Sequence, residues 1–320
     1  MARPVVLCTR KFPPAVEARL ARDYDARLDV DDRVIDGSEL LKLAEGCDAL
    51  MIASSTKLTA QAIGALPKSV KIAASFAVGY EHVDVAAAKK RGLIVTNTPE
   101  VLTDATAEIA MLCILGAARR AWEAEHMVRT GNWKGWATTQ LLGVGLNGKR
   151  LGIYGMGRIG QGVAKRARGF DMTIHYCNRT RLSPDLELGA TYHARIDDML
   201  PHCDVLSINA PASPETHHFL NAERIARMPD GAIVVNTARG TLVDDTALIS
   251  ALRSGKVRAA GLDVFENEPN LNKEYLTVEN AFLLPHIGSA TVETRDAMGF
   301  RCLDNLDAYF AGREPPHRVA

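Results

Sequence analysis

Three residues whose side chains can act together on one substrate follow three successive apolar segments of the sequence. Arg239 comes after "GAIVVNTA", Glu268 after "GLDVF" and His286 after "AFLLP". If these segments are parallel strands, their carboxyl ends border the crevice where open α/β sheets bind ligands. Arginine can hold a carboxylate in a fork, histidine can give a proton to a carbonyl oxygen, and a carboxylate beside that histidine favours its charged form. The set suits hydride transfer to a 2-oxo acid.

A glycine pattern upstream indicates where a dinucleotide would bind. Gly155, Gly157 and Gly160 form G-x-G-x-x-G directly after the apolar segment "RLGIY" and at the start of a helical pattern. The first glycine permits a tight turn, the second admits the pyrophosphate, and the third lets helix and strand approach. Exposed N–H groups at the start of the helix then hold the phosphates.

The residues expected to select the dinucleotide lie about twenty positions further along, in "HYCNRTRL" at residues 175–182. An Asp or Glu there would accept from the ribose 2′-hydroxyl and repel a 2′-phosphate. Asn178 removes that repulsion, while Arg179, Thr180 and Arg181 add donors that suit a dianion. The sequence therefore predicts NADPH, with NADH as a weaker alternative, and favours Arg179 over Arg181 as the phosphate contact.

Two series of short apolar segments, each alternating with helical patterns, are expected to position these residues. The alternation predicts βα units on parallel sheets, and 320 residues suit two α/β domains rather than one. The segments that predict strands are PVVLCT, ARLDV, DALMIAS, VKIAASF and GLIVTNT in the first series, and RLGIYGMG, MTIHYC, DVLSINAP, GAIVVNTARG, VRAAGLDVF and AFLLPHIGS in the second.

The helical patterns include two long ones. An Ala-rich pattern runs from about Thr103 to Thr130 and predicts one long helix ended by the following glycine, and a final helix is predicted from about Thr291 to Phe310. The tail "REPPHRVA", residues 313–320, is expected to be mobile. Asp185 and Glu187 are expected to be loop residues.

Composition and charge limit the partners. The formal net charge is zero, which favours neither nucleic acid nor an acidic membrane as a partner. No signal peptide and no run of about 18 apolar residues is present, so a cytoplasmic location is expected. The six cysteines include no C-x-x-C pair and the nine histidines show no metal-ligand spacing, so no metal site is expected.

Several longer motifs resemble those of one enzyme family. The segments GRIGQGVAKR, NTARGTLVDDTALISAL, AAGLDVFENEP and LPHIGSAT are similar to those of D-isomer-specific 2-hydroxyacid dehydrogenases, over about residues 45–312. Within the family, NWKGWATTQLLGVGLNGK, NRT and SFAVGYEHVD resemble the glyoxylate/hydroxypyruvate reductases. The resemblance implies NADPH-dependent reduction of glyoxylate and hydroxypyruvate to glycolate and D-glycerate by a homodimer.

The same resemblance implies a domain organisation. Two Rossmann-like or flavodoxin-like domains with parallel sheets are expected, with the active site in the cleft between them. Residues 1–99 and 287–320 are expected to form the substrate-binding domain. Residues 100–286 are expected to form the NADP-binding Rossmann domain, with a dimerisation segment at about 103–146.

The resemblance also implies roles for individual residues. His286 is implied as the proton donor, Glu268 as the group that keeps it protonated, and Arg239 as the residue that orients the substrate. The implied substrate-binding residues are Val78, Gly79, Arg239, His286, Ser289 and Trp136, of which the last would enter the neighbouring subunit's active site. The implied cofactor-binding residues are Thr106, Gly155, Met156, Gly157, Arg158, Ile159, Gly160, Asn178, Arg179, Thr180, Thr237, Ala238, Arg239, Asp263, His286 and Gly288, with Asp263 near the nicotinamide carboxamide.

Alternative interpretations stay open at this stage. The chain can be another member of the family, of the phosphoglycerate or lactate type, or a nucleotide-sensing co-regulator on the same fold. A formate dehydrogenase is similar around "HYCNRTRL" but has no need for a proton-donating His–Glu pair. Tyr80 stands in the substrate loop where relatives often have a smaller residue, which leaves the preferred substrate side chain open.

Overall fold

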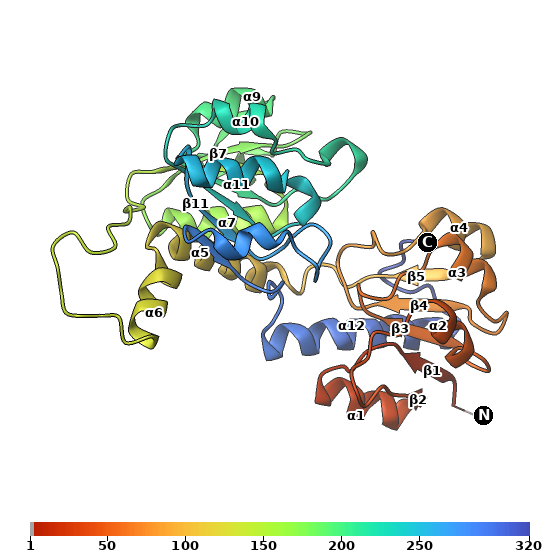
Figure 1. Ribbon diagram of the computed structural model, residues 1–320. Coiled ribbons are helices and arrows are strands. Elements are labelled where there is room, and N and C mark those ends of the chain that lie inside the picture. The colour runs from red at the N-terminus through yellow and green to blue at the C-terminus, as the bar shows by residue number, and fades with distance from the viewer. Residues whose placement is uncertain (1–2) are drawn as a thin grey trace. The chain divides into compact units, whose positions relative to one another are not determined.

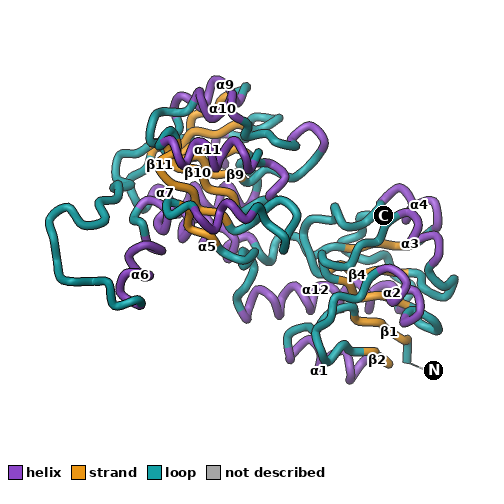
Figure 2. The backbone as a smooth tube through the Cα atoms, viewed as in Figure 1, coloured by secondary structure: helices purple, strands orange, loops and turns teal. Residues whose placement is uncertain are grey.

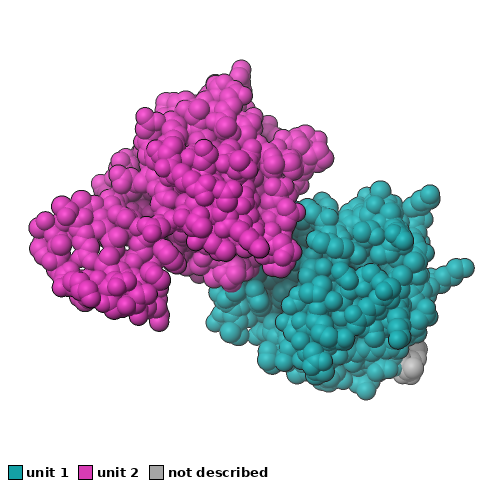
Figure 3. Space-filling view, viewed as in Figure 1, with its two compact units in different colours: residues 1–102, 289–320 teal, residues 103–288 magenta. Residues whose placement is uncertain are grey.

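The computed structural model describes residues 3–320, which divide into two compact units (Figure 3). Unit 1 consists of the described chain up to Leu102 together with Ser289–Ala320, and unit 2 is the continuous segment Thr103–Gly288. Both units are α/β folds with all-parallel sheets, so the predicted fold class is confirmed. Within residues 3–320, no helix is both long and apolar enough to cross a membrane.

Unit 1 is built on a five-stranded sheet in the order β2-β1-β3-β4-β5, which is the flavodoxin-like order (Figure 1). Its strands are β1 (Val5–Cys8), β2 (Asp25–Arg27), β3 (Ala49–Ile52), β4 (Ile72–Ser75) and β5 (Ile94–Thr96). Its helices are α1 (Pro14–Asp23), α2 (Gly37–Leu43), α3 (Ala60–Ala65), α4 (Val85–Arg91) and α12 (Val292–Phe310).

Both faces of this sheet are buried, which explains why its strands other than the edge strand β2 are apolar runs in the sequence. Successive residues of β1 point to opposite faces, so Leu7 joins one core while Val6 and Cys8 join the other. The first core is covered by α2, α3 and α4, for example through Leu40, and the second by α1 and α12, for example through Leu303.

The C-terminal tail is paired with this sheet, so the prediction that residues 313–320 are mobile is wrong. The Val319 N–H donates to the Val95 carbonyl at 2.8 Å, and the Val95 N–H donates to the Ala320 carbonyl at 3.1 Å. Ala320 is buried in the core beneath α2–α4. The tail thus supplies backbone partners to β5, whose outer edge would otherwise lack them.

Unit 2 is built on a seven-stranded sheet in the order β12-β11-β10-β9-β6-β7-β8, which contains the Rossmann order (Figure 1). Its strands are β6 (Arg150–Tyr154), β7 (Thr173–Cys177), β8 (Thr191–His193), β9 (Val205–Ile208), β10 (Ala232–Asn236), β11 (Val257–Leu262) and β12 (Ala281–Leu283). Its α-helices are α5 (Thr103–Ala118), α6 (Ala121–Arg129), α7 (Arg158–Arg168), α8 (Pro184–Glu187), α9 (Ile196–Met199), α10 (Ala222–Arg227) and α11 (Asp245–Ser254).

Helices cover both faces of this sheet as well. The buried residues of α5 and α7 pack on one face, and those of α9, α10 and α11 pack on the other. The strand order reverses between β6 and β9, where doubly wound sheets open a crevice for ligand.

The predicted long helix from Thr103 to Thr130 is broken, and that prediction is wrong. α5 ends at Ala118 and α6 starts at Ala121, because Arg120 takes a left-handed backbone conformation with φ of 54°. The Val144 N–H donates to the Ala118 carbonyl at 2.9 Å and so satisfies the end of α5. α6 and the long loop after it extend away from the sheet of unit 2 (Figures 1 and 2).

Candidate active site

Three adjacent strands of unit 2 bring the predicted catalytic residues to one edge of the sheet. β10, β11 and β12 are parallel neighbours. Arg239, Glu268 and His286 each follow the carboxyl end of one of these strands. The three loops that carry these side chains therefore lie side by side, as the spacing in the sequence predicts.

His286 and Glu268 form a hydrogen-bonded pair, in which Nδ1 of the imidazole lies 2.6 Å from Oε2 of the carboxylate. The second oxygen, Oε1, accepts the Phe265 N–H at 2.7 Å and so holds the carboxylate in place. His286 has a left-handed backbone, with φ of 55°. Nε2 is the ring nitrogen that Glu268 does not engage, and 46% of the His286 side chain is exposed.

The surroundings of Glu268 favour its charged, carboxylate form. Partial burial acts to raise the pKa of Glu268, but the hydrogen bond and charge of His286 outweigh it and hold that pKa below its ordinary value. The Phe265 N–H and the Arg239 guanidinium act in the same direction. Glu268 is therefore a carboxylate at neutral pH.

A buried asparagine and a glycine hold the backbone around Arg239. The Asn236 side chain, at the end of β10, accepts the Ala238 N–H at 3.0 Å and donates to the Arg239 carbonyl at 2.8 Å. A Cβ on Gly240 would lie 1.8 Å from the carbonyl carbon of Phe265. Only glycine lets this turn approach the loop that follows β11.

Two buried polar atoms at this edge have no partner within the described chain. Asp263 accepts the Ile287 N–H through Oδ1 at 2.8 Å, but its Oδ2 and the Thr237 Oγ1 are unpartnered. Burial raises the pKa of Asp263. A Cβ on Gly288 would lie 3.3 Å from Oδ2 and 3.4 Å from a Thr106 carbon, so these predicted cofactor residues gather at one place. Unpartnered buried polar atoms are rare, and here they suit hydrogen bonds to a bound cofactor.

The glycine-rich turn has the geometry that its pattern predicts. Gly155 has φ of 88°, and a Cβ on it would lie 2.6 Å from the Ala210 nitrogen. A Cβ on Gly160 would lie 2.6 Å from the Gly155 carbonyl oxygen, whereas one on Gly157 would meet no atom within 4 Å. The first and third glycines thus permit close packing, and the second leaves open space where a pyrophosphate can approach. The turn and the start of α7 also hold the predicted residues Met156, Arg158 and Ile159.

Asn178 takes part in the turn although it replaces the usual acid. Its Oδ1 accepts the Met156 N–H at 2.6 Å, which ties the end of β7 to the glycine-rich segment. Arg179 and Thr180 follow it and are exposed. Their side chains are therefore accessible to a group bound at the turn.

Arg181, unlike Arg179, is paired with an acidic side chain, that of Glu187. Its guanidinium bonds both oxygens of Glu187, at 2.8 and 3.1 Å, and the same carboxylate accepts the Tyr176 hydroxyl at 2.5 Å. The Arg181 bond and then the Tyr176 bond lower the pKa of Glu187. The prediction that Asp185 and Glu187 are loop residues is wrong, because both lie in α8 and Glu187 is buried. The preference for Arg179 over Arg181 agrees with this geometry.

In unit 1, the predicted substrate loop follows β4 and is held by its backbone. The Asn97 side chain donates to the Val78 carbonyl at 2.8 Å, and the Thr98 N–H donates to the Ala77 carbonyl at 2.9 Å. Gly79 is half-buried. Neither Asn97 nor Asn236 belongs to the site residues predicted from the sequence, although each is a polar residue at the end of an apolar strand.

The other predicted substrate residues lie elsewhere. Ser289 is half-buried in unit 1, just before α12, and 45% of Tyr80 is exposed. Trp136 lies in the loop after α6 with 82% of its surface exposed. Its own chain therefore buries little of the Trp136 side chain.

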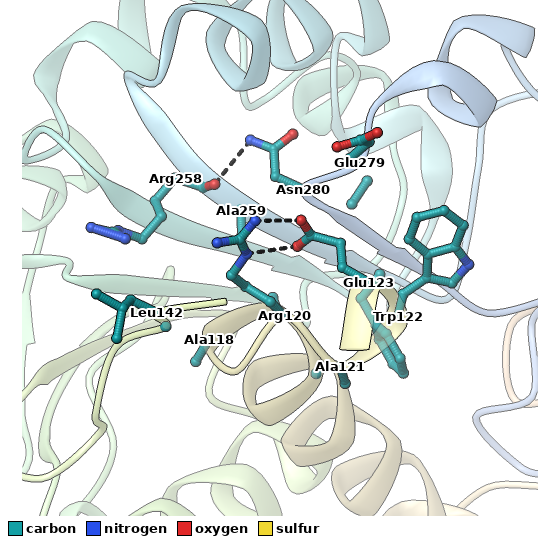
Figure 4. A pocket seen from close by; sticks show the side chains of 15 residues that line it. Ala118, Arg120, Ala121, Trp122, Glu123, Leu142, Arg258, Ala259, Glu279 and Asn280 are labelled. Atoms are coloured by element: carbon teal, nitrogen blue, oxygen red, sulfur yellow. Dashed lines mark hydrogen bonds and ion pairs between the residues drawn. The ribbon is translucent and has the colours of Figure 1, made fainter. Parts of the chain in front are cut away.

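A pocket beside α6 lies at the opposite edge of the same sheet. Arg258, Asn280 and Ala281 contribute to it from the amino ends of β11 and β12, and the Arg120–Glu123 ion pair lies on its α6 side (Figure 4). The catalytic residues follow the carboxyl ends of those strands. This pocket therefore belongs to the surface around α6 and not to the candidate active site.

Comparison with known proteins identifies the class of enzyme that this site resembles. Residues 111–288 match the family model "D-isomer specific 2-hydroxyacid dehydrogenase, NAD binding domain". The chain is 44% identical to glycerate dehydrogenase of Hyphomicrobium methylovorum, over 100% of both chains. It is 42% identical to glyoxylate reductase of Thermococcus litoralis, over 99% of this chain and 97% of that protein. An NADPH-dependent glyoxylate/hydroxypyruvate reductase of Sinorhizobium meliloti, solved with NADP and malonate, matches with a TM-score of 0.86 and 34% identity over 100% of this chain and 97% of that one.

Proposed function

Because this chain belongs to the D-isomer-specific 2-hydroxyacid dehydrogenase family, we propose that it uses NADPH to reduce glyoxylate and hydroxypyruvate to glycolate and D-glycerate. It is an oxidoreductase with a nicotinamide cofactor that acts on small 2-oxo or 2-hydroxy acids. The finer proposal concerns the substrate, the cofactor preference and the residues that act.

The observation that carries the proposal is the His286–Glu268 pair at the carboxyl edge of the sheet. Glu268 engages Nδ1, so Nε2 is the nitrogen that can give its proton to the substrate carbonyl oxygen. Glu268, as a carboxylate, stabilises the imidazolium before that transfer. Arg239 orients the substrate carboxylate and polarises the carbonyl.

Bound NADPH supplies the hydride, and the unpartnered polar atoms suit its nicotinamide end. Asp263 Oδ2 can accept a hydrogen bond from a carboxamide N–H, and the Thr237 hydroxyl can donate to or accept from a carboxamide group. Ala238 is half-buried beside Thr237, and Thr106 and Gly288 lie next to Asp263. At the other end, the open space at Gly157 and the first N–H groups of α7 suit the pyrophosphate.

The residues after β7 support the proposed preference for NADPH over NADH. Asn178 carries no charge that would repel a 2′-phosphate, and the exposed Arg179 and Thr180 can donate to it. Arg181 does not take this role, because Glu187 already holds it. The NADP complex of the Sinorhizobium meliloti relative supports the same choice.

A kinetic panel tests the proposal. Purified protein is given glyoxylate, hydroxypyruvate, pyruvate and 3-phosphohydroxypyruvate in turn, each with NADPH and with NADH, and cofactor oxidation is followed by absorbance. The highest kcat/KM is expected for glyoxylate or hydroxypyruvate with NADPH. A preference for 3-phosphohydroxypyruvate or for NADH would contradict the proposed substrate or cofactor, and cofactor binding without any turnover would favour the co-regulator alternative.

We also propose that the chain forms a homodimer through α6 and the loop after it. Large apolar side chains are exposed along this segment, namely Trp122, Val128, Trp133, Trp136 and Leu142. A segment of this kind, extending from its own domain without a core, marks a protein–protein interface. Trp136 would then contribute to the partner's active site. Analytical ultracentrifugation tests this proposal: a dimer is expected, weakened in a Trp133→Ala/Trp136→Ala variant, and a wild-type monomer would refute it.

A further inference from the structure

Two imidazoles and a carboxylate lie together on unit 2, outside the proposed catalytic pair. Nε2 of His218 is 3.1 Å from Oε2 of Glu266, and Nε2 of His217 is 3.6 Å from Oε1 of the same carboxylate. The two rings stack with their centroids 4.0 Å apart. The three possible ligand atoms all lie within 4.8 Å of one another. Each carboxylate oxygen thus faces a different imidazole.

The backbone holds both histidines in this arrangement. The His218 N–H donates to the Thr241 carbonyl at 2.8 Å, and the next residue, Phe219, is buried and stacks on Tyr154 with ring centroids 3.7 Å apart. Adjacent side chains of an extended strand point in opposite directions. The left-handed conformation of His218, with φ of 46°, turns the chain so that His217 and His218 share one side.

The carboxylate comes from a loop that is equally fixed. A Cβ on Gly240 would lie 2.1 Å from the Glu266 nitrogen, so the Glu266 backbone packs directly against the turn after β10. The Glu266 side chain is 25% exposed, compared with 36% for His218 and 53% for His217. The site is therefore open to an ion from solvent on the side of His217.

These donors have the chemistry and the spacing of a metal site. Zn²⁺ binds imidazole nitrogen at about 2.0–2.1 Å and carboxylate oxygen at about 2.0–2.2 Å, so neighbouring donors of a tetrahedral site lie about 3.3–3.5 Å apart. Each imidazole nitrogen lies near that distance from one carboxylate oxygen, at 3.1 Å for His218 and 3.6 Å for His217, and one donor atom from each residue lies within 4.8 Å of the other two. We propose that His217, His218 and Glu266 bind a dication of the Zn²⁺ class. Imidazole ligands favour Zn²⁺, Ni²⁺ or Cu²⁺ over Mg²⁺ and Ca²⁺.

A metal bound at this site would affect the candidate active site through the backbone that connects them. Glu266 stands two residues before Glu268, and its backbone contacts Gly240, the residue after Arg239. When the Glu266 carboxylate binds a metal, the loop that also carries Glu268 shifts. Because Glu268 then no longer lies correctly beside His286, turnover falls. This consequence rests on the proposed function, whereas the binding itself does not.

Calorimetry of the full-length protein tests the binding. Metal-free protein is titrated with Zn²⁺ at neutral pH, where imidazole is available as a ligand. Changing a group outside the inner set of ligands already weakens a metal site about 10- to 100-fold, so removing a ligand is expected to weaken this one at least about tenfold. His217→Ala and Glu266→Gln should show that loss. His202→Ala is the matched control, because it removes an imidazole from a separate group with His175 and His193.

Zn²⁺ binding that is at least about tenfold weaker in both ligand variants, with the wild-type affinity retained in His202→Ala, supports the site. No binding to the wild type, or binding unchanged in His217→Ala, overturns it. Zn²⁺ should also slow NADPH oxidation by the wild type and by His202→Ala but not by His217→Ala, and equal inhibition of all three would refute the link to turnover. If the metal-free protein showed no turnover, the proposed function would fail and the calorimetric result would still decide the site.

Discussion

Replacing Arg179 with alanine should weaken NADPH and leave NADH almost unchanged. Arg179 is exposed immediately after the Asn178–Met156 hydrogen bond, and Arg181, the other arginine of this loop, is bonded to Glu187. A hydrogen bond to a charged group contributes about 1.5–3 kcal/mol. At about 1.4 kcal/mol for each factor of ten, that corresponds to about 10- to 150-fold in affinity. Because the contact is exposed to solvent and salt, we expect the lower end, about tenfold.

The assay measures KM for each cofactor with glyoxylate at saturation and constant ionic strength. Arg181→Ala is the matched control, since it removes the same charge from the same loop. Its expected effect is lower stability, because the buried Glu187 loses a partner, with the KM for NADPH close to that of the wild type. An equal loss for both cofactors in Arg179→Ala would refute the contact with the 2′-phosphate. An equal loss of NADPH affinity in both variants would mean that only the net charge of the loop matters.

Three further predictions test other parts of the structure. Gly157→Ala should fold like the wild type, because its Cβ meets no atom within 4 Å, yet bind NADPH poorly in a fluorescence titration; Gly155→Ala, with φ of 88°, should mainly lower Tm. Equal effects of the two variants on stability would contradict the roles given to these glycines. Deleting residues 319–320 removes the Val319–Val95 and Val95–Ala320 hydrogen bonds and should lower the free energy of unfolding by about 2–3 kcal/mol, at roughly 1 kcal/mol for each bond plus the lost burial of Ala320; an unchanged urea midpoint would show that these two residues are dispensable. Burial, followed by the neighbouring histidines, lowers the pKa of His175 and His193, so the unfolded chain binds more protons than the folded one and stability should fall as the pH drops below about 6.5. Urea midpoints across that range should fall less steeply in His193→Gln, and an identical slope would contradict this origin.

The strand pattern and the order of site residues could be predicted from the sequence, because both depend on local composition. Apolar runs marked the strands of both sheets except two edge strands of three residues, each with two polar residues. These are β8 (Thr191–His193), which was not predicted, and β2 (Asp25–Arg27), which the predicted segment ARLDV overlaps only at Ala26 and Arg27. The carboxyl ends of β10, β11 and β12 placed Arg239, Glu268 and His286 correctly at one edge, because strand ends in a parallel sheet share a side.

Features that depend on contacts between distant segments could not be predicted. The break between α5 and α6 has no glycine or proline at Arg119-Arg120, and the Val144 N–H that caps α5 comes from far along the chain. The pairing of the tail with Val95 is of the same kind. His218 and Glu266 are 48 positions apart, which is why ligand spacing in the sequence indicated no metal site.

Replacing His286 with glutamine tests the central claim most directly. Glutamine is close to histidine in size and keeps a polar group beside Glu268, but it cannot donate a catalytic proton. The measurement is kcat for glyoxylate reduction at saturating NADPH, together with NADPH affinity from fluorescence titration. General acid catalysis contributes about 10²- to 10⁴-fold, so kcat should fall by at least about a hundredfold even when NADPH is saturating. A kcat within about threefold of the wild type would contradict the assignment of His286 as the proton donor.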